Sequence, residues 1–177
     1  MFDRLFDIVF QFLDLFKFWV VIDEFEQGVI LRLGKYHRVV GPHDGWRTTG
    51  LHFTIPFNVD NVLVDNVVPR TVNLGEQGLT TLDGKSITVS AVVTAQIRDI
   101  RRALCDVENV DEALMDSCYA TIGDLIVAHN WETVRTPEFT ETVTKACRKQ
   151  AFRYGLEVLR VQFADRIPSR AIRLLSS

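Results

Sequence analysis

The side chains that could do catalytic or metal chemistry are few in this chain, and they are widely spaced. His43 and His52 lie close together with Asp44 beside the first, but no third ligand follows at helix or strand spacing, as a zinc site would require. Cys147 and His129 could act as nucleophile and base, yet no local signature supports that pair. A hydrolase using Cys147 or Asp44 is therefore the weakest of the functional hypotheses.

Glycine patterns that bind phosphates or form nucleophile elbows are absent from the sequence. Neither GxGxxG nor GxxxxGK[ST] occurs, and GxSxG is also missing. The three cysteines, Cys105, Cys118 and Cys147, show no CxxC spacing, and their odd number argues against a disulfide framework. We expect reduced, mostly buried thiols. The sequence predicts a protein that is not an enzyme, with no catalytic residue, metal site or cofactor.

Composition points to a folded protein. The chain has 177 residues, of which 47% are hydrophobic and 24% charged, with a net charge of −3. This length supports one domain with a core, and the composition disfavours disorder. The slightly negative charge gives no reason to expect a nucleic-acid partner.

The N-terminal stretch FDIVFQFLDLFKFWVVI, residues 6–22, is apolar but interrupted by charges. An Asp or Lys near the centre of a spanning helix costs about 2.5–3.5 kcal/mol, so the apolar residues would at best offset the cost of crossing a bilayer. As a helix, its polar residues would share one face, which favours an in-plane membrane anchor over residues 1–22. Packing on a domain or a neighbouring subunit remains an alternative, as does a true span. The expected membrane contacts are Phe2, Phe6, Phe10, Leu13, Phe16 and Trp19.

Strand patterns dominate the first half of the chain, and helix patterns follow. Pro69 predicts a bulge or an edge strand, and Asp83-Gly84 predicts a hairpin turn. The expected strands are residues 27–33, 36–40, 51–55 and 61–74, a hairpin within 79–97, and a last strand over 156–163.

Helix boundaries are marked by capping residues. Asn109 followed by Glu112 predicts an N-terminus, as does Thr136 followed by Pro137, and Gly155 predicts a C-terminus. The expected helices are residues 99–107, 109–128 and 137–154. Strands followed by helices and one closing strand predict an α+β fold, with a mainly antiparallel sheet in the first half packed against helices from the second half.

Charge is unevenly distributed along the second half. Residues 99–144 carry ten acidic and three basic residues, whereas residues 145–177 carry eight basic and two acidic residues. Two solvated faces of one domain would explain this, and so would a head-to-tail contact between subunits. The expected subunit interface joins Asp106, Glu108, Asp111, Glu112 and Asp116 to Arg148, Lys149, Arg153, Arg160, Arg166, Arg170 and Arg173.

Four motifs, in this order, resemble those of the stomatin/prohibitin/flotillin superfamily, the SPFH or band 7 domain. They are EQGV at 26–29, GLHF at 50–53 with Pro56, TLDG at 81–84 with IRD at 97–99, and GLEV at 155–158 with Val161. The resemblance implies an SPFH domain over 23–168, preceded by the anchor and followed by a short tail, 169–177. Family members usually continue into a long coiled-coil helix, of which this tail would be the start.

The resemblance further implies a membrane-associated oligomeric scaffold rather than an enzyme. Such proteins form rings or cages that organise membrane patches or corral membrane proteases and channels. The expected partners are membrane lipid, further copies of the chain, and a membrane protease or channel, with the domain facing the cytoplasm. The segment 43–49 looks like an insertion, which makes Trp46 a further candidate for lipid contact. The alternative function is a monomeric or small-oligomer adaptor that binds a membrane protease or channel.

Overall fold

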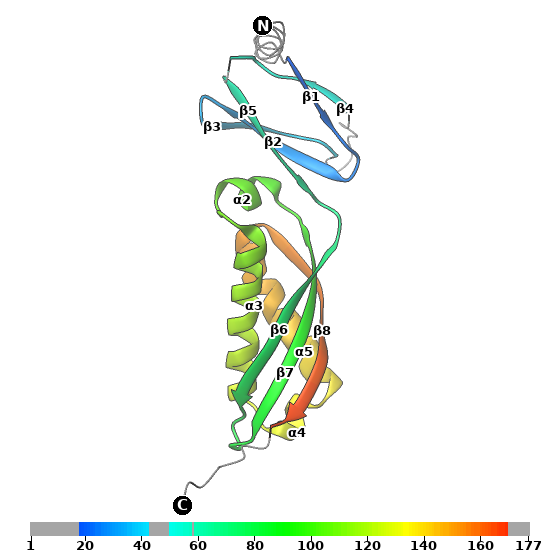
Figure 1. Ribbon diagram of the computed structural model, residues 1–177, viewed down its shortest axis with the longest axis vertical. Helices are drawn as coiled ribbons and strands as arrows, with labels where there is room; N and C mark the ends of the chain where they lie inside the picture. The colour runs from blue at the N-terminus through cyan, green and yellow to red at the C-terminus, as the bar shows by residue number, and fades with distance from the viewer. Residues whose placement is uncertain (1–17, 43–49, 58, 170–177) are drawn as a thin grey trace, which may run out of the picture. The chain divides into compact units, whose positions relative to one another are not determined.

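The computed structural model describes residues 18–42, 50–57 and 59–169 (Figure 1). The chain divides into two compact units, Met1–Val68 and Pro69–Ser177. Several predicted contact residues lie outside the described residues, so their roles remain predictions: Phe2, Phe6, Phe10, Leu13, Phe16, Trp46, Arg170 and Arg173.

The first unit contains two small antiparallel sheets. One pairs β1 with β4, and the other has the order β3-β2-β5. Leu33 and Gly34 both have positive φ, at 50° and 76°, and form the two-residue turn between β2 and β3. The strands are β1 (Trp19–Ile22), β2 (Glu26–Arg32), β3 (Lys35–Val40), β4 (Gly50–Phe53) and β5 (Asp60–Asn66).

Ile22, Ile30 and Val40 form the small buried core of the first unit. An ion pair reinforces the β2–β5 pairing beside it. The Arg32 Nε and Nη2 atoms donate to the two Asp60 carboxylate oxygens at 2.8 and 3.1 Å, and the Ile55 amide donates to Asp60 at 2.9 Å. These three bonds satisfy a carboxylate that is only 1% exposed.

The second unit is a three-stranded antiparallel sheet of order β6-β7-β8, with helices packed against it (Figure 1). Helix α3 contacts β6, α5 contacts β8, and the two helices contact each other. The elements are β6 (Arg70–Thr80), β7 (Ser86–Ile97), α2 (Ile100–Cys105), α3 (Val110–Val127), α4 (Trp131–Val134), α5 (Pro137–Ala151), the 3₁₀ turn η1 (Phe152–Tyr154) and β8 (Leu156–Pro168).

The core of the second unit follows directly from sequence periodicity. Every second residue of β7 from Ile87 to Ile97 is buried, which gives the central strand one apolar face. The helices meet it with residues four positions apart, which lie on one face of a helix. These are Leu114, Cys118, Ile122 and Ile126 of α3 and Phe139, Val143, Cys147 and Ala151 of α5.

The predicted α+β class, the hairpin around Asp83-Gly84 and the helix caps are confirmed. The Asn109 side chain accepts from the Asp111 and Glu112 amides, and Thr136 caps α5 with Pro137 at its first position. Gly155 ends η1 with φ of 78°.

Four expectations differ from the structure. Residues 19–22, predicted as part of the anchor, form strand β1, because their partners in β4 supply hydrogen bonds. The predicted strand 61–74 is two strands, separated around Pro69, which has no amide N–H to donate to a sheet. The last strand is longer than predicted, and helix α4 was missed.

Candidate functional site: two interaction surfaces

The residues considered for catalysis are not arranged as a catalytic site within the described residues. His52 lies on β4 opposite Val20, in the first unit. His129 lies in the second unit, where its Nδ1 atom is 2.7 Å from the Leu125 carbonyl oxygen and its ring packs edge-on against Phe139. Across residues 18–42, 50–57 and 59–169, no group of three His, Cys, Asp or Glu side chains could hold a metal ion. His43 and Asp44 lie outside those ranges.

Cys147 is completely buried, where α5 packs against α3. A hydrogen bond with Cys118, together with burial, raises the pKa of the Cys147 thiol. Burial and a raised pKa both disfavour the thiolate that nucleophilic catalysis needs. The expectation of mostly buried thiols is confirmed: Cys118 and Cys147 are buried, and Cys105 is exposed at the end of α2.

The first candidate surface is an apolar face on the β1–β4 sheet. Trp19 pairs directly with Phe53, and Val21 pairs with Leu51. All four side chains are more than half exposed, from 53% for Trp19 to 71% for Phe53. We call these four residues the apolar face. Three aromatic or aliphatic residues near these strands in the sequence are also exposed: Phe18, just before β1, and Ile55 and Phe57, shortly after β4.

Strand alternation explains why this face exists. Successive side chains of a strand point to opposite sides, so Val20 and Ile22 turn toward the core of the first unit while Trp19 and Val21 turn away. Solvent-facing strand positions are normally polar. Here apolar residues occupy both sides, which makes the outer side a candidate interaction surface. The sequence identified Trp19, but it gave no sign of its partners on β4.

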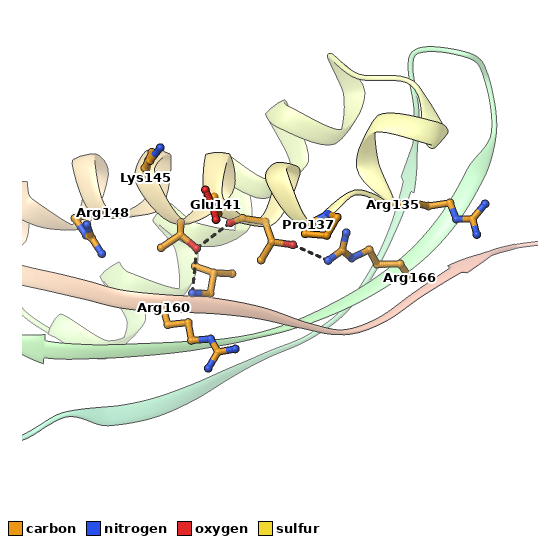
Figure 2. A pocket seen from close by; sticks show the side chains of 10 residues that line it. Arg135, Pro137, Glu141, Lys145, Arg148, Arg160 and Arg166 are labelled. Atoms are coloured by element: carbon orange, nitrogen blue, oxygen red, sulfur yellow. Dashed lines mark hydrogen bonds between the residues drawn. The ribbon is translucent and has the colours of Figure 1, made fainter.

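The second candidate surface is a basic groove between α5 and β8, with a volume of about 570 Å³ (Figure 2). Threonine hydroxyls and five cationic side chains line it, with Glu141 as its one carboxylate. Four of the cations form no ion pair with any carboxylate in the described part of the chain: Lys145, Arg148, Arg160 and Arg166. In the fifth, Arg135, the Nη1 atom lies 3.8 Å from Glu132 Oε2, and the guanidinium lies over the Trp131 ring.

Two of these arginines build the groove itself. Arg148 donates from Nε to the Val158 carbonyl at 2.8 Å and from Nη2 to the Leu159 carbonyl at 3.2 Å. Arg166 donates to the Val134 and Thr136 carbonyls and, at 2.6 Å, to Thr140 Oγ1.

Arg166 also stacks over Phe163 at 4.3 Å, and burial lowers its pKa. Its charge is thus held by carbonyl and hydroxyl dipoles without a carboxylate. The groove keeps an excess of positive charge at a partly desolvated position.

The acidic residues predicted for a subunit interface fall into two groups. Asp111 is used within the unit, where it lies 3.0 Å from Arg70 Nη2. Asp106, Glu108, Glu112 and Asp116 are exposed. Of the predicted basic residues, Arg148, Arg160 and Arg166 line the groove, whereas Lys149 and Arg153 are exposed outside it. The sequence missed Arg135 and Lys145, because nothing in a charge count shows which cations share a groove.

Comparison with known proteins identifies the same family that the four sequence motifs resemble. The model of the SPFH domain / Band 7 family matches residues 20–173 and so spans both units. The chain is 35% identical to protein HflK of Vibrio cholerae over 117 residues, which is 63% of this chain and 27% of that protein. It is 27% identical to protein HflK of Haemophilus influenzae over 158 residues, 86% of this chain and 36% of that protein.

A third relative is the stomatin-like protein stl-1 of Caenorhabditis elegans. It is 24% identical over 149 residues, which cover 82% of this chain and 44% of stl-1. The chain therefore spans less than half the length of each of these three relatives. In the described residues, no helix is long and apolar enough to cross a bilayer. On the family match and the four ordered motifs, the chain belongs to the SPFH domain / Band 7 family.

Proposed function

We propose that this protein is a membrane-associated scaffold or regulator that contacts the bilayer through the apolar face of its first unit. The observation that carries this proposal is the exposure of Trp19, Val21, Leu51 and Phe53 side by side on one sheet surface. Tryptophan and phenylalanine are residues that membrane-surface proteins bury at the interface. Membership in the band 7 family supports the same function.

The size of the apolar face fits reversible membrane attachment. Full burial of a large apolar side chain contributes about 1.5–3 kcal/mol. The four residues are roughly half exposed, so moving them into the acyl boundary would contribute about 3–6 kcal/mol. That range is comparable to a single weak membrane signal, and stable anchoring usually needs two. The apolar segment 1–17, which joins β1 directly in sequence, would be the second signal.

Scaffolding by self-association, in a ring or cage, is the finer part of the proposal. The basic groove and the exposed acidic side chains of the second unit support it through their complementary charge. The alternative is a monomeric or small-oligomer adaptor whose groove binds a membrane protease or channel. Orientation of the second unit toward the cytoplasm is part of the same proposal.

Vesicle flotation of the full chain tests membrane attachment. The parent chain should float with phosphatidylcholine vesicles, because neutral lipid isolates the apolar contribution. The double variant Leu51→Ser/Phe53→Ser should bind at least about tenfold more weakly, since it removes the two β4 members of the apolar face. A parent chain that stays at the bottom of the gradient would overturn the proposal.

Two controls separate the apolar face from general hydrophobicity and from the anchor. Leu82 is 66% exposed in the second unit, so Leu82→Ser should leave flotation unchanged. Removal of residues 1–17 should weaken binding without disturbing β1. Removal of residues 1–22 would also delete β1 and the buried Ile22, and would therefore confuse anchoring with folding.

A further inference from the structure

The basic groove of the second unit is built like a receptor for negatively charged side chains. It combines Lys145, Arg148, Arg160 and Arg166 with a volume of about 570 Å³. Arg148 and Arg166 are fixed by carbonyl and hydroxyl acceptors, so their two guanidinium groups are preorganised. Glu141 supplies one negative charge against five positive ones. An anionic occupant would neutralise this excess.

Lys145 and Arg160 are the cations best placed to receive a ligand. Both are exposed, one from α5 and one from β8, and neither forms an ion pair with a carboxylate of the described residues. Between them, Thr144 joins the two walls: its hydroxyl donates to the Thr140 carbonyl at 2.8 Å and accepts from the Val161 amide at 3.3 Å. In Figure 2, Lys145, Arg148 and Arg160 lie toward one end of the groove, and Arg135 and Arg166 lie toward the other.

The same unit also carries an acidic surface, whose charge is opposite to that of the basic groove. Glu112 and Asp116 are exposed on α3, one helical turn and about 6 Å apart along the axis. They lie on the side of α3 opposite to the buried Leu114 and Cys118. Two carboxylates at this spacing repel each other, and no ion pair with a described cation relieves that repulsion. With Asp106 and Glu108 just before the helix, they form what we call the acidic row.

We propose that the acidic row of one copy docks into the basic groove of the next copy, with Glu112 and Asp116 facing Lys145 and Arg160. This inference rests on the proposed scaffold function and names its self-contact. In the proposed contact each copy uses its acidic row on one neighbour and its basic groove on the other, so the contact is head-to-tail and repeats from subunit to subunit. Opposite charge sets the register of the contact and makes it sensitive to salt.

Charge-reversal variants of the full chain, in non-ionic detergent, test this contact by sedimentation velocity. The parent should associate with increasing concentration at about 50 mM salt and dissociate at about 500 mM salt. Glu112→Lys/Asp116→Lys and Lys145→Glu/Arg160→Glu should each weaken association by more than about tenfold, since like charges would then face each other. All four positions are exposed, so circular dichroism should show both variants folded.

A mixture of the two variants is the decisive sample. Each junction in the mixture again pairs opposite charges, so association should return to the parent level. The matched controls are Asp124→Lys, further along α3, and Arg153→Glu, a cation outside the groove; both should associate like the parent. A monomeric parent, unaffected reversal variants, or a mixture that fails to associate would each overturn the inference.

Vesicle flotation of these variants separates this inference from the proposed membrane attachment. The charge reversals lie in the second unit and should float like the parent. Normal flotation with charge-independent association would refute the self-contact alone. Charge-dependent association without flotation would refute membrane attachment and leave the self-contact standing.

Discussion

Trp19 lies directly opposite Phe53 in the β1–β4 sheet, and both side chains are more than half exposed. Because neither residue contributes to the core, Phe53→Ser should change the free energy of unfolding by less than about 1 kcal/mol. Ile22→Ala, on the buried side of the same sheet, should cost about 2–4 kcal/mol. Urea denaturation of the two variants checks the difference. A loss of several kcal/mol from Phe53→Ser would mean that the apolar face is part of the fold.

The Arg32–Asp60 pair predicts an acid-sensitive first unit. The Arg32 guanidinium, which donates to both carboxylate oxygens, holds the pKa of Asp60 at about 2. A carboxylate whose pKa is lower in the folded state stabilises that state above its unfolded pKa of about 3.9, and the contribution is lost as pH falls toward 2. Asp60→Asn should therefore cost about 1–3 kcal/mol at pH 7 and less at pH 3.

Urea denaturation of chains carrying Trp46→Phe and Trp131→Phe, followed by Trp19 fluorescence at both pH values, measures this effect in the first unit. Glu24→Gln, at an exposed carboxylate of the same unit, is the matched control, and its stability should fall less than that of Asp60→Asn. Equal losses from Asp60→Asn at pH 7 and pH 3 would contradict the role of the ionised pair.

Gly155 marks a position where only glycine fits. Its φ is 78°, and an added Cβ would lie 2.4 Å from the Asp99 carbonyl oxygen. The Gly155 carbonyl also accepts from the Arg98 and Asp99 amides, so the backbone cannot move away cheaply. Gly155→Ala should cost more than about 2 kcal/mol.

Gly123 lies inside α3, where replacement by alanine should stabilise the protein rather than destabilise it. A Cβ there would have ordinary contact with Leu79 at 3.8 Å, so Gly123→Ala should stabilise the protein by about 0.5–1 kcal/mol. Thermal unfolding of both variants distinguishes backbone strain from a general intolerance of substitution. The account of Gly155 is wrong if the two alanines have similar effects.

Thiol reactivity should differ among the three cysteines. Cys105 is exposed, whereas Cys118 and Cys147 are buried between α3 and α5. A thiol-specific chromogenic reagent should therefore modify only Cys105 in the folded protein, and all three in denaturant. Cys105→Ser should abolish the rapid phase. Fast reaction of a second thiol in that variant would show that the α3–α5 contact opens readily.

Local signals predicted much of the fold. Turns and helix caps act through neighbouring residues, so they can be predicted from the sequence alone. This holds for the turn at Asp83-Gly84, the N-caps Asn109 and Thr136, and the C-cap Gly155. The break around Pro69 was missed because β-type residues continue on both sides of it, and long-range contacts decide where each strand pairs.

The candidate surfaces were harder to predict than the fold. Residues Trp19–Ile22 form a short apolar run, whose periodicity cannot distinguish the end of a helix from a strand. Leu51 and Phe53 become part of a surface only when β4 pairs with β1. Charge counting likewise placed Arg148 and Arg166 in one basic block, but it could not show that their guanidinium groups hold carbonyl oxygens inside the unit.

Fluorescence quenching of Trp19 by brominated lipid tests membrane contact most directly. The full chain with Trp46→Phe and Trp131→Phe retains Trp19 as its one tryptophan. On phosphatidylcholine vesicles brominated in the acyl chains, Trp19 emission should shift to the blue and be strongly quenched, since its ring would lie at the acyl boundary. Unshifted and unquenched emission from protein that floats with the same vesicles would contradict the account, because the apolar face would then lie away from the bilayer.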